Sequence, residues 1–183
     1  MLSRKTMKIH IKILTQPDQF TTKERIRAMN KVYHTARINV KLASSEVLHG
    51  VEDLNDLDIG GEGGSDIPPC SGATTDEQDR LSGFRRNVPE GEIVVYICRH
   101  MTNANTGCAT HPENKPMAVI TATSPLYTLA HEIGHLLGLK HPRKKSPERL
   151  MNKGGTSSVM ASDPLPILIE SEIKKMRKSA FLT

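Results

Sequence analysis

The chain has 183 residues, a formal net charge of +5 and a hydrophobic content of 37%, with only 3% aromatic residues. This length is sufficient for a substantial core, so we expect residues 1–183 to form a single domain packed mainly with aliphatic residues and methionine. No apolar run approaches the roughly 18 residues that cross a bilayer, which argues against a membrane-spanning protein.

Positive charge is concentrated in two clusters that contain no interleaved aromatic residues. Basic nucleic-acid sites commonly combine such charges with stacking side chains, so we interpret the clusters as solvated faces of a monomer that binds no nucleic acid. The clusters comprise Lys140, Arg143, Lys144 and Lys145, and Lys174, Lys175, Arg177 and Lys178.

The start of the chain is basic, but Ile9, Ile11 and Ile13 alternate with polar residues. This pattern predicts a strand over Lys8–Leu14 and lacks the continuous apolar centre of a secretory signal. Residues 1–6 are expected to be disordered or foreign to the natural chain. The localisation stays open between the cytoplasm, non-classical export and a mature form from which a signal has been removed.

A helix is predicted next, with Thr21 or Thr22 as its N-cap and apolar residues at helical spacing to about Ala36. Alternating apolar and polar residues then predict a strand over Ile38–Leu42, with a continuation towards Leu48 left open.

Residues 51–71 are acidic and rich in glycine, and we interpret them as a solvated surface loop. Calcium is a weaker alternative, because the carboxylates could gather this ion but do not follow the spacing of an EF-hand. Thr74 or Thr75 then caps a short helix that reaches Phe84. The nearly continuous β-branched run Ile93–Cys98 predicts a central strand that is buried on both faces.

Two further helices and one strand are predicted in the last part of the chain. Met117–Thr121 is the strand, and Tyr127–Leu139 is the first of the helices. The last helix presents one apolar stripe, made of Ile169, Ile173, Met176 and Ala180.

The three cysteines allow one disulfide and one free thiol. Cys98 belongs to the central strand pattern and is expected to be a small buried hydrophobe. We favour a disulfide between Cys70 and Cys108, because both lie in loop-like segments that can meet disulfide geometry more easily than a strand interior.

The stretch His131–His141, with the sequence HEIGHLLGLKH, carries the most specific chemistry. On a helix, His131 and His135 lie one turn apart on the same face and can bind one divalent ion, while Glu132 lies about 100° round the helix, near an ion-bound water. Gly138 can end the helix with a left-handed backbone, so that His141 returns as a third ligand. Three protein ligands leave one tetrahedral position open, which is typical of catalytic zinc; a structural site would require a fourth ligand.

This stretch resembles the signature of the metzincin clan of zinc metalloproteases, HExxHxxGxxH followed by a methionine turn beneath the metal. The resemblance implies an α+β, zincin-like fold: a mixed twisted sheet with an active-site helix, a backing helix and a C-terminal helix. We assign Met151 to the turn because a short connection can fold directly under the site, with Met160 as the alternative. The resemblance also implies an edge strand that pairs with a peptide substrate, formed by Gly107, Cys108, Ala109 and Thr110.

The expected activity is that of a zinc-dependent endopeptidase. One Zn²⁺ held by His131, His135 and His141 would activate water, and Glu132 would act as general base and then as general acid. Two alternatives stay open. The chain could be an inactive zinc-binding module of the same fold, or a hydrolase of non-peptide amides.

Overall fold

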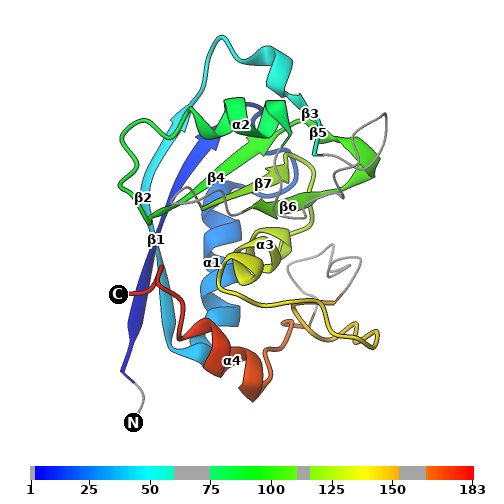
Figure 1. Ribbon diagram of the computed structural model, residues 1–183. Coiled ribbons are helices and arrows are strands. Elements are labelled where there is room, and N and C mark those ends of the chain that lie inside the picture. Colours follow the sequence, from blue (N-terminus) through cyan, green and yellow to red (C-terminus); the bar gives the residue numbers. More distant parts are fainter. Residues whose placement is uncertain (1–2, 60–74, 111–115, 153–163) are drawn as a thin grey trace.

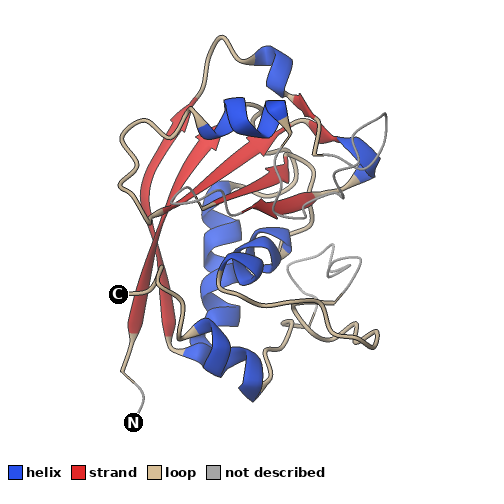
Figure 2. Cartoon of the chain, viewed as in Figure 1, coloured by secondary structure: helices blue, strands red, loops and turns tan. Residues whose placement is uncertain are grey.

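The computed structural model describes residues 3–59, 75–110, 116–152 and 164–183 (Figure 1). A five-stranded sheet forms its centre, with the strand order β2-β1-β4-β7-β6. Neighbouring strands are parallel except β6 and β7, which are antiparallel. The strands are β1 (Lys5–Ile13), β2 (Ile38–Val47), β4 (Ile93–Cys98), β6 (Gly107–Thr110) and β7 (Met117–Thr121). The predicted α+β fold with a mixed, twisted sheet is confirmed (Figure 2).

Strand β4 lies in the middle of the sheet, and all six of its residues are buried. Its alternating side chains divide between two cores: Ile93, Val95 and Ile97 pack into one, whereas Val94 and Tyr96 pack into the other. Successive residues of a strand point to opposite faces, so a strand covered on both sides needs apolar residues throughout. The unbroken apolar run in the sequence therefore reflects a sheet with two covered faces.

Helices α1 (Thr22–Tyr33) and α3 (Thr128–Leu136) cover one face of the sheet (Figures 1 and 2). Thr21 and Glu24 form a reciprocal capping box at the start of α1. The buried Tyr33 hydroxyl donates a hydrogen bond to the carbonyl oxygen of Ala130 at 2.7 Å. This bond connects the end of α1 to the first turn of α3, so α1 acts as a backing helix for the residues that follow Ala130.

The opposite face is covered by α2 (Asp76–Ser82), which Thr75 caps, together with residues 51–59. The prediction of a solvated loop is wrong for 51–59, since Val51, Leu54, Leu57 and Ile59 are buried. This segment contains the 3-10 turn η2 (Glu52–Leu54) and the strand β3 (Asp56–Leu57), which pairs with β5 (His100–Met101) ahead of the 3-10 turn η3 (Thr102–Ala104).

Two exposed acidic residues of the same segment pair with arginines. Asp53 pairs with Arg80, and Asp56 pairs with Arg99. Each guanidinium holds the pKa of its partner carboxyl below the ordinary value. Residues 60–71, which carry the rest of the predicted calcium loop, lie outside the described part of the chain, so calcium binding stays a prediction.

The last residue of the chain pairs with the first strand. Lys5 and Thr6, which the sequence left outside the fold, belong to β1, and Thr6 exchanges backbone hydrogen bonds with Thr183. The 3-10 turn η1 (His34–Ala36) follows α1, and the last helix α4 (Glu170–Met176) ends earlier than its predicted stripe. No helix among the described residues is long and apolar enough to cross a membrane.

Candidate metal centre

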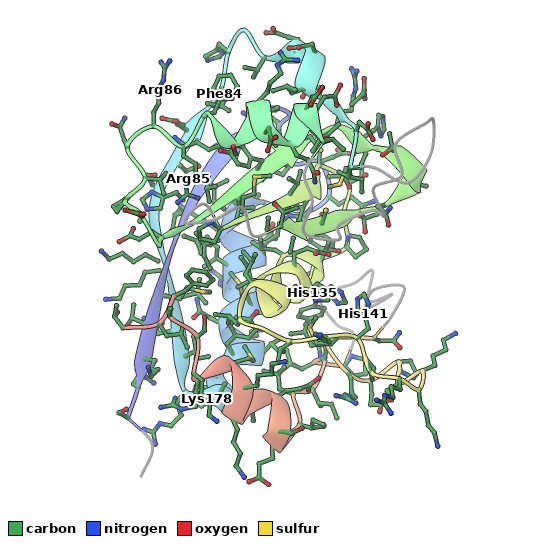
Figure 3. All side chains as sticks on the ribbon, viewed as in Figure 1. Phe84, Arg85, Arg86, His135, His141 and Lys178 are labelled. Carbon is green, nitrogen blue, oxygen red and sulfur yellow. The ribbon has the colours of Figure 1, made fainter. Side chains whose placement is uncertain are left out.

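Helix α3 presents His131 and His135 one turn apart, and the chain reverses directly after it. Gly138 has a φ of +90°, a left-handed conformation that glycine adopts without steric penalty. The Gly138 N–H donates to the His135 carbonyl at 2.8 Å, and the Leu139 N–H donates to the Gly134 carbonyl at 2.9 Å. This turn returns the chain towards the helix, so that His141 lies beside His135 (Figure 3).

The three imidazole rings converge through their Nε2 atoms. The Nε2 of His131 lies 3.1 Å from that of His141, and the Nε2 of His135 lies 3.2 Å from each of the other two. A tetrahedral zinc ion bound at about 2.0–2.1 Å would hold its nitrogen ligands about 3.3 Å apart. The nitrogen triangle therefore fits a single zinc ion, and it is the one such group of potential ligands within the described residues.

Backbone carbonyls fix the orientation of two of the rings. The Nδ1 of His131 lies 2.7 Å from the carbonyl oxygen of Leu150, and the Nδ1 of His135 lies 3.1 Å from that of Leu139. A carbonyl accepts but cannot donate, so each Nδ1 carries the proton and each Nε2 presents a lone pair. Such contacts are the usual support for histidine ligands of a metal.

Burial controls the charge of the central residues. It lowers the pKa of His131 to about 4, so this ring is neutral at pH 7 and free of a competing proton. Burial also raises the pKa of Glu132 to about 8, because the residue is only 7% exposed and its charged form is poorly solvated. A neutral imidazole and a carboxyl with a pKa near neutrality are suited to metal binding and to proton transfer, respectively.

Met151 lies directly beneath α3. It is fully buried, and a Cβ atom placed on Gly134 would come within 2.7 Å of its Sδ. Leu150, the preceding residue, supplies the carbonyl that orients His131. The short connection after His141 thus brings Met151 under α3, and its assignment as the methionine turn stays a prediction. The alternative, Met160, lies outside the described residues.

Strand β6 runs along the other side of Glu132. A Cβ atom on Gly107 would lie 2.5 Å from Glu132 Oε1, 2.8 Å from Glu132 Cγ and 2.7 Å from Thr128 Cγ2. These separations are well below an ordinary contact of about 3.5–4.0 Å, so only glycine permits this approach of the strand to the helix. Gly107 therefore allows the edge strand to cover the Glu132 side chain.

The predicted edge strand lies at an edge of the sheet, and no strand pairs with its outer side in the ranges described. Cys108 and Thr110 are buried, whereas Gly107 and Ala109 are half-buried. Cys108 is disulfide-bonded and Cys98 is a free buried thiol. Cys70, the partner that we expect for Cys108, lies outside the described residues. Whether β6 binds a peptide stays a prediction.

Sequence reasoning missed three contributions to the site: the contact of Gly107 with Glu132, and the carbonyls of Leu139 and Leu150 that orient the histidines. Backbone carbonyls leave no mark in the side-chain sequence. The one available signal was the glycine within the predicted edge strand, since glycine in a strand often marks a close approach of backbone.

The fold and the site together define an α+β protein of zincin-like fold with a three-histidine cluster able to bind zinc. No protein-family model matches the chain, and no curated protein matches it in sequence. Among solved structures, it is similar to an archaemetzincin from Methanopyrus kandleri, with 18% identity, a TM-score of 0.57 and coverage of 94% of each chain.

A second similar structure is an archaemetzincin from Archaeoglobus fulgidus complexed with malonate. It has 15% identity and a TM-score of 0.44, over 92% of this chain and 99% of that one. At 18% identity, the likeness to the first of these structures concerns the fold alone.

Proposed function

We propose that the chain is a zinc-dependent endopeptidase that acts as a single-domain monomer on peptide or protein substrates. The observation that carries this proposal is the convergence of three Nε2 atoms within 3.2 Å of one another, next to a buried glutamate. A zinc ion bound there would lower the pKa of water and polarise a substrate carbonyl. Calcium plays no part in the proposed chemistry.

The residues of the chain have separate roles in this proposal. His131, His135 and His141 hold the metal, and the carbonyls of Leu150 and Leu139 keep two of the rings in the binding orientation. Glu132 accepts a proton from the attacking water and delivers it to the departing amine, so the residue is unchanged after one turnover. Its position one residue after the ligand His131 supports this role, and a zinc ion bound at the cluster would favour the carboxylate form that accepts the proton.

The substrate would lie along β6. This strand has an unpaired outer side within the described structure and passes directly over Glu132. An extended peptide that adds to such an edge obtains backbone hydrogen bonds and is held next to the metal cluster. The scissile amide would then lie between the edge strand and the three histidines.

The proposal is tested by measuring zinc content and cleavage of a quenched fluorescent peptide library, with and without a chelator. The wild-type protein is expected to hold one zinc per chain and to cleave peptides until the chelator is added. Glu132→Gln should retain the zinc and lose cleavage, whereas His131→Ala should lose both. Full cleavage by Glu132→Gln would refute the assigned base, and a zinc-loaded wild type that cleaves no peptide would favour the inactive binding module.

A further inference from the structure

A cavity lies away from the metal cluster, between the starts of β1 and β2 and the end of α1. These ends of the elements lie at the foot of the molecule in Figure 1. Its volume is about 410 Å³, within the range of sites for small ligands. The lining residues come from three consecutive parts of the fold and are mostly polar or cationic: Arg4, Asn30, His34, Arg37, Ile38 and Asn39.

Among the described residues, no carboxylate pairs with the arginines of this cavity. Its lining contains no carboxylate, and within the described residues the side chains of Arg4, His34 and Arg37 form no ion pair or hydrogen bond. Asn30 differs, because its side-chain amide is occupied by both backbone groups of Val40, at 2.8 and 2.9 Å. Among the lining side chains that the structure describes, the donors that remain available are those of Arg4, Arg37, His34 and Asn39, and the two arginines carry the positive charge.

The backbone that carries the two arginines is held in place by a third arginine. Arg177 donates to the carbonyl of Ala36 at 2.8 Å and to the carbonyl of Ser3 at 2.9 Å. The Lys5 N–H donates to the Arg37 carbonyl at 2.9 Å. Arg4 and Arg37 thus extend from adjacent, fixed points of the chain, although more than thirty residues separate them in the sequence.

Arg37 also has an unusual backbone conformation. Its φ of 53° lies in the left-handed region, where a side chain with a Cβ is strained and glycine is not. The position follows the η1 turn, where glycine is the usual residue. Arginine thus occupies a backbone position that glycine would adopt with less strain.

We propose that this cavity binds a phosphate-type oxyanion. Two guanidinium groups present planar pairs of donors that match phosphate oxygens, and they carry enough charge to neutralise a dianion. Ile38 supplies an apolar wall next to these donors, and the volume leaves room for a small organic group attached to the phosphate. The proposal does not depend on the peptidase activity, since it uses none of the residues of the metal cluster.

Isothermal titration calorimetry with inorganic phosphate tests this inference. It is performed on the zinc-loaded protein at pH 8 and low ionic strength, with acetate of matched ionic strength as the monoanion comparison. We expect one saturable phosphate site per chain and weaker binding of acetate. Arg4→Ala and Arg37→Gly should each weaken phosphate binding about tenfold or more, because each removes a charged hydrogen-bond donor.

Two controls separate this site from general charge effects and from unfolding. Lys23→Ala removes an exposed cation of α1 outside the cavity, and should change the phosphate affinity by less than about twofold. Arg37→Gly keeps a residue suited to the left-handed backbone, so its melting temperature should not fall below that of the wild type. A loss of binding in this variant then reports the missing guanidinium.

A third control addresses phosphate that approaches the metal. His135→Ala, which is expected to lose the zinc, should retain the same phosphate site. The inference is overturned if the wild type shows no saturable binding, if Lys23→Ala weakens binding as much as Arg37→Gly does, or if binding is lost in His135→Ala and retained in Arg37→Gly.

Discussion

Replacing Gly107 by alanine should disable Glu132 without removing the metal. The new Cβ would lie 2.5 Å from Glu132 Oε1 and 2.8 Å from Glu132 Cγ. Restoring an ordinary contact of about 3.5 Å requires the carboxylate to move by about 1 Å. Because a catalytic group displaced by that distance commonly loses about 10²-fold in rate, we expect a loss of that size in kcat. Overpacking between β6 and α3 should also lower the free energy of unfolding by about 1–3 kcal/mol.

The assay compares kcat and KM on a quenched peptide substrate with zinc content and melting temperature. A double-mutant cycle with Glu132→Asp separates displacement of the base from general damage, since aspartate is shorter and retracts from the strand. The Glu132→Asp change should cost less activity in the Gly107→Ala background than in the wild type. Unchanged kcat in folded, zinc-loaded Gly107→Ala would refute the reasoning, and so would strictly additive effects in the cycle.

Three further predictions concern the surroundings of the site. Gly134→Ala places a Cβ 2.7 Å from Met151 Sδ, so the free energy of unfolding, measured with denaturant, should fall by about 1–3 kcal/mol. Adding Met151→Ala to this variant should relieve part of the clash. Equal stability of Gly134→Ala and the wild type would contradict this contact. The hydrogen bond from His10 and the contact with Lys8 hold the pKa of Glu92 below its ordinary value of 4.5. The ionised carboxylate therefore stabilises the folded state above pH 4.5, and this contribution is lost as the pH falls below that value. Glu92→Gln should therefore be less stable than the wild type at pH 7, and this difference in the free energy of unfolding should shrink as the pH falls below 4.5. A stability difference independent of pH would rule out this assignment. Burial raises the pKa of Cys98 to about 12, so iodoacetamide at pH 8 should modify this thiol only after unfolding; rapid modification of the native protein would show that the thiol is accessible.

The elements that depend on local chemistry could be predicted from the sequence. Thr21 and Thr75 each form a reciprocal capping box with the residue three positions later, which is a signal contained in four consecutive residues. The strand Ile93–Cys98 was predicted with its observed bounds, because burial on both faces requires an unbroken apolar run. The spacing within the metal stretch likewise predicts the convergence of the imidazoles, although their role as ligands stays a proposal.

Features that depend on distant partners could not be predicted. Residues 51–59 pack on the sheet through a 3-10 turn and a two-residue strand, both too short to show periodicity, and β3 pairs with β5 more than forty residues away. The last helix ends at Met176 although its apolar stripe continues to Ala180, because the chain then turns back and Thr183 pairs with Thr6. The carbonyls that orient the histidines belong to the tertiary fold and have no counterpart in a pattern of side chains.

The most direct test of the central claim is X-ray absorption spectroscopy at the zinc edge of the purified, zinc-loaded protein. The account predicts three nitrogen ligands and one oxygen from water at about 2.0–2.1 Å, with no sulfur, and Glu132→Gln should give the same spectrum. A sulfur ligand at about 2.3 Å, or a spectrum unchanged by His141→Ala, would contradict a catalytic ion held by His131, His135 and His141.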